Sequence, residues 1–110
     1  MEGQFAALVA CDVQERLPLW STALQPLPRG ESMVTSLLRE EDTGMVKKCK
    51  CFQVIPVHES SIINKDKLHS LAKTLEDFHH LYPYADVCGY LCFEDNAGSI
   101  TYFELEVVKA

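Results

Sequence analysis

Residues 64–82 read NKDKLHSLAKTLEDFHHLY, and this stretch decides most of the expected architecture. Its apolar residues recur at intervals of three and four, which places them on one face of a helix. Asn64 is a favourable N-cap, and Pro83 ends the helix. The spacing therefore predicts a long amphipathic helix. Its apolar face comprises Leu68, Leu71, Ala72, Leu75, Phe78 and Tyr82.

Strand patterns lie on both sides of this helix. Residues 48–58 (KCKCFQVIPVH) alternate, with Cys49, Cys51, Ile55 and Val57 on one face and Phe52, Val54 and the lysines on the other. Pro56 predicts an edge or a bulge at the end of this strand, because proline donates no ladder hydrogen bond. After the helix, residues 87–93 and 100–108 predict a hairpin joined through residues 95–98. In its last strand, Phe103, Leu105 and Val107 are expected to face inward.

The first half of the chain has shorter signals. Residues 4–11 (QFAALVAC) are almost continuously apolar, which is typical of a strand buried on both faces. Asp12 resembles an N-cap with Glu15 in capping-box position, and Pro18 limits the helix that would follow. Residues 32–42 predict a short amphipathic helix that ends near Gly44.

These elements together predict a single α+β domain over residues 1–110. It would be a two-layer sandwich in the order β-α-β-α-β-β, with one mainly antiparallel sheet and a long amphipathic helix.

Residues 17–29 (LPLWSTALQPLPR) contain three prolines and several large apolar side chains. One interpretation is a loop folded back over the core. The other is an apolar surface offered to a partner, for which Trp20, with Leu24 and Leu27, would be the anchors. The sequence leaves both interpretations open.

Composition narrows the class of partner. The chain has 110 residues, 47% of them hydrophobic, and a net charge of −6. No apolar run approaches the roughly 20 residues that span a bilayer, and no secretory leader pattern opens the chain. The acidic excess falls from Glu76 onward, and we expect it to decorate one face. Other proteins are therefore the expected partners, with no membrane and no nucleic acid, in an intracellular, reducing compartment.

The five cysteines are Cys11, Cys49, Cys51, Cys88 and Cys92. An odd count in apolar runs favours reduced, buried thiols over a disulfide framework. Zinc binding by these thiols with His58, His79 or His80 is the alternative, although the spacing is not that of a Cys-x-x-Cys knuckle. We expect no metal and no cofactor.

No catalytic or nucleotide-binding motif is present, so the sequence predicts a protein that is not an enzyme. The last strand has few of the lysines and prolines that block an edge, which favours self-association into a homo-oligomer. The alternative is a small acidic inhibitor or immunity-type protein that masks a basic surface of its partner. A third hypothesis is a thiol or zinc enzyme that pairs one cysteine with His58 or His79.

Three motifs resemble an adenoviral family, the early-region-four protein encoded by the third reading frame, which builds nuclear tracks. They are Gly44-Met45-Val46 followed by Cys49 and the strand to Val57, Cys88 to Phe93 with the Ala97-Gly98 turn, and Phe103-Glu104-Leu105-Glu106-Val107. The chain departs from the family at its assembly residues: the family's self-assembly asparagine corresponds to Tyr84 or its neighbours, and the family's Asp-Leu pair in the last strand falls near Tyr102-Phe103. The resemblance implies a viral early protein, a non-enzymatic homo-oligomeric scaffold that captures and reorganises host nuclear proteins in the nucleus. The candidate interface residues are Trp20, Leu24, Leu27, Tyr84, Tyr102, Phe103, Glu104 and Glu106.

Overall fold

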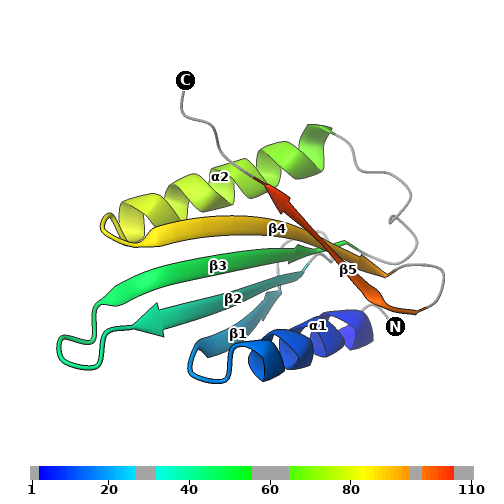
Figure 1. Ribbon diagram of the computed structural model, residues 1–110. Coiled ribbons are helices and arrows are strands. Elements are labelled where there is room, and N and C mark those ends of the chain that lie inside the picture. The colour runs from blue at the N-terminus through cyan, green and yellow to red at the C-terminus, as the bar shows by residue number, and fades with distance from the viewer. Residues whose placement is uncertain (1–2, 27–31, 56–64, 95–97, 106–110) are drawn as a thin grey trace.

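The computed structural model describes residues 3–26, 32–55, 65–94 and 98–105, and it has an α+β fold (Figure 1). A helix comes first, three strands follow, and a second helix precedes the last two strands. The elements are α1 (Gly3–Arg16), β1 (Ser21–Pro26), β2 (Ser32–Arg39), β3 (Val46–Val54), α2 (Lys65–Leu81), β4 (Asp86–Glu94) and β5 (Ile100–Leu105). Neither described helix is long and apolar enough to span a membrane.

The described strands form one mixed sheet in the order β1-β2-β3-β4-β5. Neighbouring strands are antiparallel except β3 and β4, which are parallel because the chain crosses between them through α2. Figure 1 shows α2 running along β4 and β5 crossing the end of the sheet at a steep angle. Strands β1 and β5 are therefore the two edges of the sheet.

The two helices pack on opposite faces of this sheet. Alternate residues of β3 point to opposite sides, so Cys49 and Cys51 join the core with Leu71 and Leu75 of α2. Phe52 joins the other core, which α1 fills from its own apolar face. The arrangement is thus helix, sheet, helix, and not the two-layer sandwich expected from the sequence. The α1 core comprises Phe5, Ala6, Val9, Val13, Val34, Phe52, Val54 and Cys92.

The second half of the chain follows the sequence pattern. Leu71 and Leu75 of α2 are buried, whereas Ala72 is exposed. A turn follows, in which Ala85 N–H donates to the carbonyl of Tyr82 (3.1 Å). Pro83 is the second residue of this turn, a position that suits its fixed φ. Strands β4 and β5 form the predicted hairpin. The predicted alternation over residues 48–55 is also present, since Cys49 and Cys51 of β3 lie in the same core as Ile55. Pro56, Val57 and residues 95–97 lie outside the described residues.

The first element is a helix, and the prediction of a strand over residues 4–11 was wrong. Phe5, Val9 and Val13 lie four residues apart and are buried on one face of α1, while Leu8 and Cys11 are exposed. A short apolar run fits either a buried strand or a helix, and alanine favours the helix. Because α1 continues to Arg16, Asp12 lies within the helix and is not its N-cap.

The short helix predicted over residues 32–42 is instead β2. Met33 and Val34 are both buried, but they contribute to the α2 core and the α1 core respectively, as neighbouring residues of a strand do. Gly44 has φ +70° in the turn between β2 and β3, a conformation that glycine adopts readily. The stretch predicted as a loop over residues 17–29 contains β1, while residues 27–31 lie outside the described part of the chain.

Candidate interaction surfaces

The edge strand β5 presents an aromatic side chain to solvent. Phe103 pairs with Leu91 in the β4–β5 register and therefore lies on the face that α2 covers. Since α2 contacts mainly β4 and β3, Phe103 lies beyond the helix and is 54% exposed. The expectation that Phe103 faces inward was wrong, whereas Leu105 is half-buried against the α2 core. Among the described strands, none pairs with the outer edge of β5.

Tyr102 points to the opposite face, where it links the edge strand to α1. Its hydroxyl donates a hydrogen bond to Asp12 Oδ2 at 2.6 Å. Burial, together with this carboxylate, raises the pKa of Tyr102. Glu104 lies on the same face, opposite Tyr90 in the register, and is exposed. The edge strand therefore carries different chemistry on its two faces.

The other predicted interface residues lie elsewhere. Trp20 is half-buried at the end of the loop after α1, and Leu24 is exposed on β1, the opposite edge of the sheet from Phe103. Tyr84 is 87% exposed in the turn between α2 and β4. The structure does not bring these three residues together with the residues of β5. Leu27 and Glu106 lie outside the described residues.

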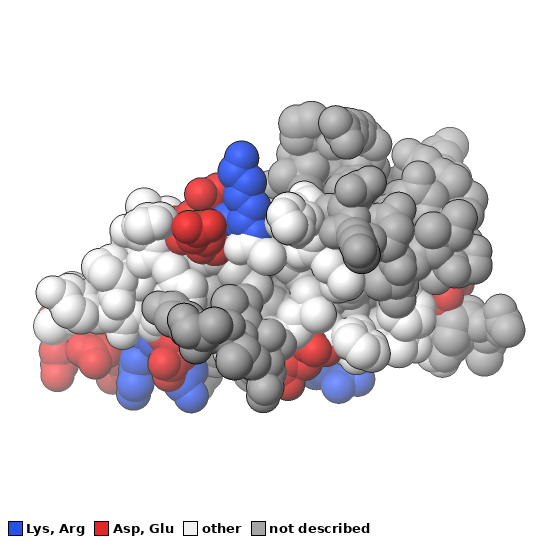
Figure 2. All heavy atoms as spheres, turned by 90° about the horizontal axis from the view of Figure 1, so that it is seen from above, with Lys and Arg blue, Asp and Glu red and all other residues white. Residues whose placement is uncertain are grey.

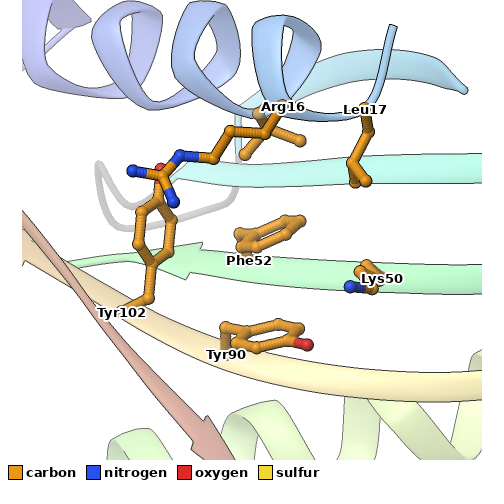
Figure 3. Close-up of a pocket in the computed structure, with 7 residues that line it drawn as sticks. Arg16, Leu17, Lys50, Phe52, Tyr90 and Tyr102 are labelled. Atoms are coloured by element: carbon orange, nitrogen blue, oxygen red, sulfur yellow. The ribbon is translucent and has the colours of Figure 1, made fainter. Parts of the chain in front are cut away.

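A pocket that the sequence did not predict lies between the end of α1 and the sheet (Figure 3). We call it the α1 pocket, and it has a cavity volume of about 210 Å³. Its floor is aromatic, because Phe52 stacks on Tyr90 (4.8 Å between ring centroids) and meets the ring of Tyr102 edge-on (5.7 Å). The lining residues are Val13, Arg16, Leu17, Lys50, Phe52, Tyr90 and Tyr102.

Two cations flank this floor at different ends, as Figure 3 shows. Arg16 Cζ lies 5.7 Å from the centroid of Tyr102, and its Nε is 3.0 Å from Asp12 Oδ2. Lys50 Nζ lies 5.5 Å from the ring of Trp20 and 5.6 Å from that of Tyr90. Within the described part of the chain, Lys50 forms no ion pair.

The α1 pocket could have been predicted from the sequence only if the first element had been identified as a helix. Lys50 and Phe52 were correctly placed on one face of β3, opposite Cys49 and Cys51. The pocket needs α1 above that face, and the prediction of a strand over residues 4–11 left out the helix that supplies Val13 and Arg16. The spacing of Phe5, Val9 and Val13 is the signal that was missed.

The cysteines do not form a metal centre in the described residues, where no three metal-ligating side chains converge. Cys49, Cys51 and Cys92 are buried, as expected from the sequence, whereas Cys11 is exposed and Cys88 is half-buried. The sulfur atoms of Cys49 and Cys51 are 3.8 Å apart beneath α2. The neighbouring Cys49 sulfur and burial both raise the pKa of Cys51, and burial raises that of Cys92.

One hollow brings a thiol and an imidazole to the same surface. It has a cavity volume of about 480 Å³, and both His79 and Cys88 line it, with Asp86 and Glu104. Burial, and then the charge of Glu104, raise the pKa of Cys88. A nucleophilic cysteine needs the opposite shift, so this environment is unfavourable for thiolate chemistry.

The acidic side chains are not gathered on one face, contrary to the expectation from the sequence. Glu76 and Asp77 are exposed on α2, whereas Glu104 lies on the face that α1 covers. Figure 2 shows acidic side chains beside basic ones among the described residues seen from above. The acidic excess is thus divided between the two sides of the sheet.

The link between Tyr102 and Asp12 gives a stability prediction. Removing the hydroxyl by Tyr102→Phe should lower the free energy of unfolding by about 1.5 kcal/mol, because the hydrogen bond is made to a charged group. Urea denaturation measures the change. Tyr84→Phe is the matched control, and at its exposed site the change should stay within about 0.5 kcal/mol. Equal effects of the two substitutions would contradict this role for Tyr102.

No family model, curated protein sequence or solved structure matches this chain significantly.

Proposed function

We propose that this chain is a non-enzymatic interaction protein that self-associates through the outer edge of β5. The observation that carries the proposal is Phe103, a large aromatic side chain, exposed on an edge strand that pairs with no other described strand on its outer side. The backbone groups along a sheet edge are a template for pairing with another chain. A second copy of the same strand is an occupant of matching length and chemistry.

An antiparallel pairing of two β5 strands about a two-fold axis at Phe103 fits the side chains. It places Phe103 opposite the same residue of the second copy, and aromatic cross-strand pairs are favourable. In the same register Tyr102 meets the second copy's Glu104, and Thr101 meets its Leu105. The two Glu104 carboxylates are therefore not opposite one another, which avoids like-charge repulsion across the new strand pair.

The opposite edge of the sheet is less suited to pairing. Strand β1 ends at Pro26, and proline at an edge is one of the features that block pairing. Its other residues are mostly small or polar, with Leu24 as its large apolar side chain. We therefore assign self-association to β5 and not to β1.

The adenoviral resemblance extends the proposal to cellular function. Under it, the homo-oligomer is a viral early protein that acts as a scaffold, capturing and reorganising host nuclear proteins in the nucleus. The raised pKa of Cys88 supports a role without thiol catalysis.

Size-exclusion chromatography with light scattering, over a wide range of concentrations, tests self-association. The mass should rise from that of one chain to that of two or more. Phe103→Glu should weaken the association by about tenfold or more, because it removes the aromatic pair and sets two carboxylates opposite each other.

Leu19→Glu is the matched control, because Leu19 is 89% exposed but lies in the loop between α1 and β1. It should leave the association unchanged. A wild-type protein that stays monomeric at every concentration would refute the proposal. Equal effects of the two variants would show that the interface does not lie at β5.

A further inference from the structure

The α1 pocket is held in place before any ligand arrives. Asp12 accepts a hydrogen bond from the Tyr102 hydroxyl, which holds the ring in place, and it also pairs with Nε of the largely exposed Arg16, which orients the guanidinium. Phe52 is fixed between the rings of Tyr90 and Tyr102. Such preorganisation lowers the entropy cost of binding.

The volume of the α1 pocket limits the size of what it holds. Sites that enclose drug-sized ligands measure roughly 300–1,000 Å³, whereas this pocket measures about 210 Å³. It therefore accommodates about one large side chain. The aromatic floor, with Val13 and Leu17 beside it, makes an apolar side chain the suitable one.

The two cations at the ends of the α1 pocket indicate which groups should flank the apolar side chain of a ligand. Arg16 pairs with Asp12 through Nε, and its two Nη groups have no hydrogen-bond partner among the described residues. Lys50, at the other end of the floor, contacts only aromatic rings there. Both groups attract carboxylates, and a guanidinium binds a carboxylate through two parallel hydrogen bonds.

From this geometry we infer that the α1 pocket docks a short peptide segment of a partner protein, in which a bulky apolar residue lies between two acidic residues. The apolar residue fills the cavity over Phe52, and the flanking carboxylates meet Arg16 and Lys50. A free aromatic acid carries one carboxylate and would leave one of the cations unmatched. A basic segment would be repelled by both.

Two acidic groups of the chain lie near these cations and weaken their attraction for a carboxylate of the ligand. Asp12 offsets part of the charge of Arg16. Glu104 lies across from Tyr90. Burial, and then the charge of Glu104, raise the pKa of that tyrosine, and the same charge opposes an incoming carboxylate at this end of the floor. Removing its charge by Glu104→Gln should therefore strengthen docking.

A peptide titration monitored by NMR tests the inference. The probe is the unlabelled heptapeptide Ser-Gly-Asp-Phe-Glu-Gly-Ser, added to isotope-labelled protein. Amide shifts should concentrate at the residues that line the α1 pocket. A peptide with Asn and Gln in place of the acids, and one with Ala in place of Phe, should each bind about tenfold more weakly or worse.

Charge variants of the protein provide the matched comparison. Lys50→Gln and Arg16→Gln should each weaken binding of the acidic peptide about tenfold. Lys47→Gln makes the same change of charge on β3 at an exposed residue outside the pocket, and it should have no effect. A weakening by Lys47→Gln equal to that of Lys50→Gln would reveal general attraction to basic residues and overturn the inference.

Two further results would also overturn it, namely shifts outside the α1 pocket only, or equal binding of the acidic and neutral peptides. The inference does not require self-association, because every residue that lines the α1 pocket comes from one chain, although Tyr102 of the pocket lies on the strand proposed to pair. Repeating the titration with Phe103→Glu separates the two hypotheses, since that variant should still bind the peptide.

Discussion

Gly89→Val should lower the free energy of unfolding by about 3 kcal/mol or more, and Gly89→Ala by about 2 kcal/mol. A Cβ atom at this position would lie 2.6 Å from Leu75 Cδ1 and 2.9 Å from Cδ2. Leu75 is only 2% exposed, so its side chain has little space into which it can move. Valine is otherwise favoured in strands, and a loss of stability would therefore report the contact between α2 and β4. Urea denaturation provides the measurement.

A double-mutant cycle identifies the cause of that loss. Leu75→Ala alone should cost about 2–5 kcal/mol, because it leaves a cavity in the core. Combined with Gly89→Ala it should cost less than the sum of the two single changes, by about 1 kcal/mol or more, since each substitution makes room for the other. Strict additivity, or a neutral Gly89→Ala, would show that the close approach to Leu75 does not limit this position.

The second half of the fold was predictable because each of its patterns fits one type of element. In α2 the recurrence of Leu68, Leu71 and Leu75 continues for several turns, which no strand reproduces. In β3 the alternation of lysine and cysteine over residues 48–51 favours a strand over a helix. Pro83 marks a turn that the structure also contains, and Gly98, just before β5, has φ +81°.

The first half was not predictable in this way, because its signals are short. Residues 4–11 are apolar at almost every position, so the run fits a buried strand as well as a helix. In residues 32–39, Met33 and Val34 serve two cores on opposite faces, and this removes the alternation that identifies a half-buried strand. The type of each element is decided by tertiary contacts, namely α1 covering the face that carries Phe52 and β2 lying between two strands.

The exposure of Phe103 and the formation of the α1 pocket also depend on tertiary contacts that the sequence does not reveal. The sequence correctly placed Phe103 and Leu105 on one face of the last strand, but whether α2 reaches them is a question of helix position. Phe103 lies beyond its reach and is exposed. The α1 pocket needs Val13, Phe52 and Tyr102 from three separate elements, so it follows only from the topology.

The buried thiols make the protein sensitive to alkaline pH. Cys51 and Cys92 are fully buried, and their pKa values are raised, by the adjacent Cys49 sulfur with burial for Cys51 and by burial with Asp12 for Cys92. In the unfolded chain both thiols ionise near pH 8.5, at about the ordinary cysteine pKa. Above that pH the unfolded chain releases protons that the folded protein retains, so stability is complete at neutral pH and falls as pH rises.

The expected loss is large enough to measure by urea denaturation with a phosphine reductant present. Each thiol that stays protonated in the folded state should cost about 2 kcal/mol between about pH 7 and pH 10, or about 4 kcal/mol for the two. The Cys92→Ala variant should start less stable, because it carries a cavity, but its profile should be flatter by about 2 kcal/mol, the loss from one thiol. The Cys49–Cys51 sulfur pair is intact in this variant, so its coupled titration contributes equally to both proteins and cancels in the comparison. Cys11→Ala, at an exposed site, should keep the wild-type profile. If Cys92→Ala lost stability in parallel with the wild type, ionisation of the buried Cys92 thiol would not contribute to the alkaline instability.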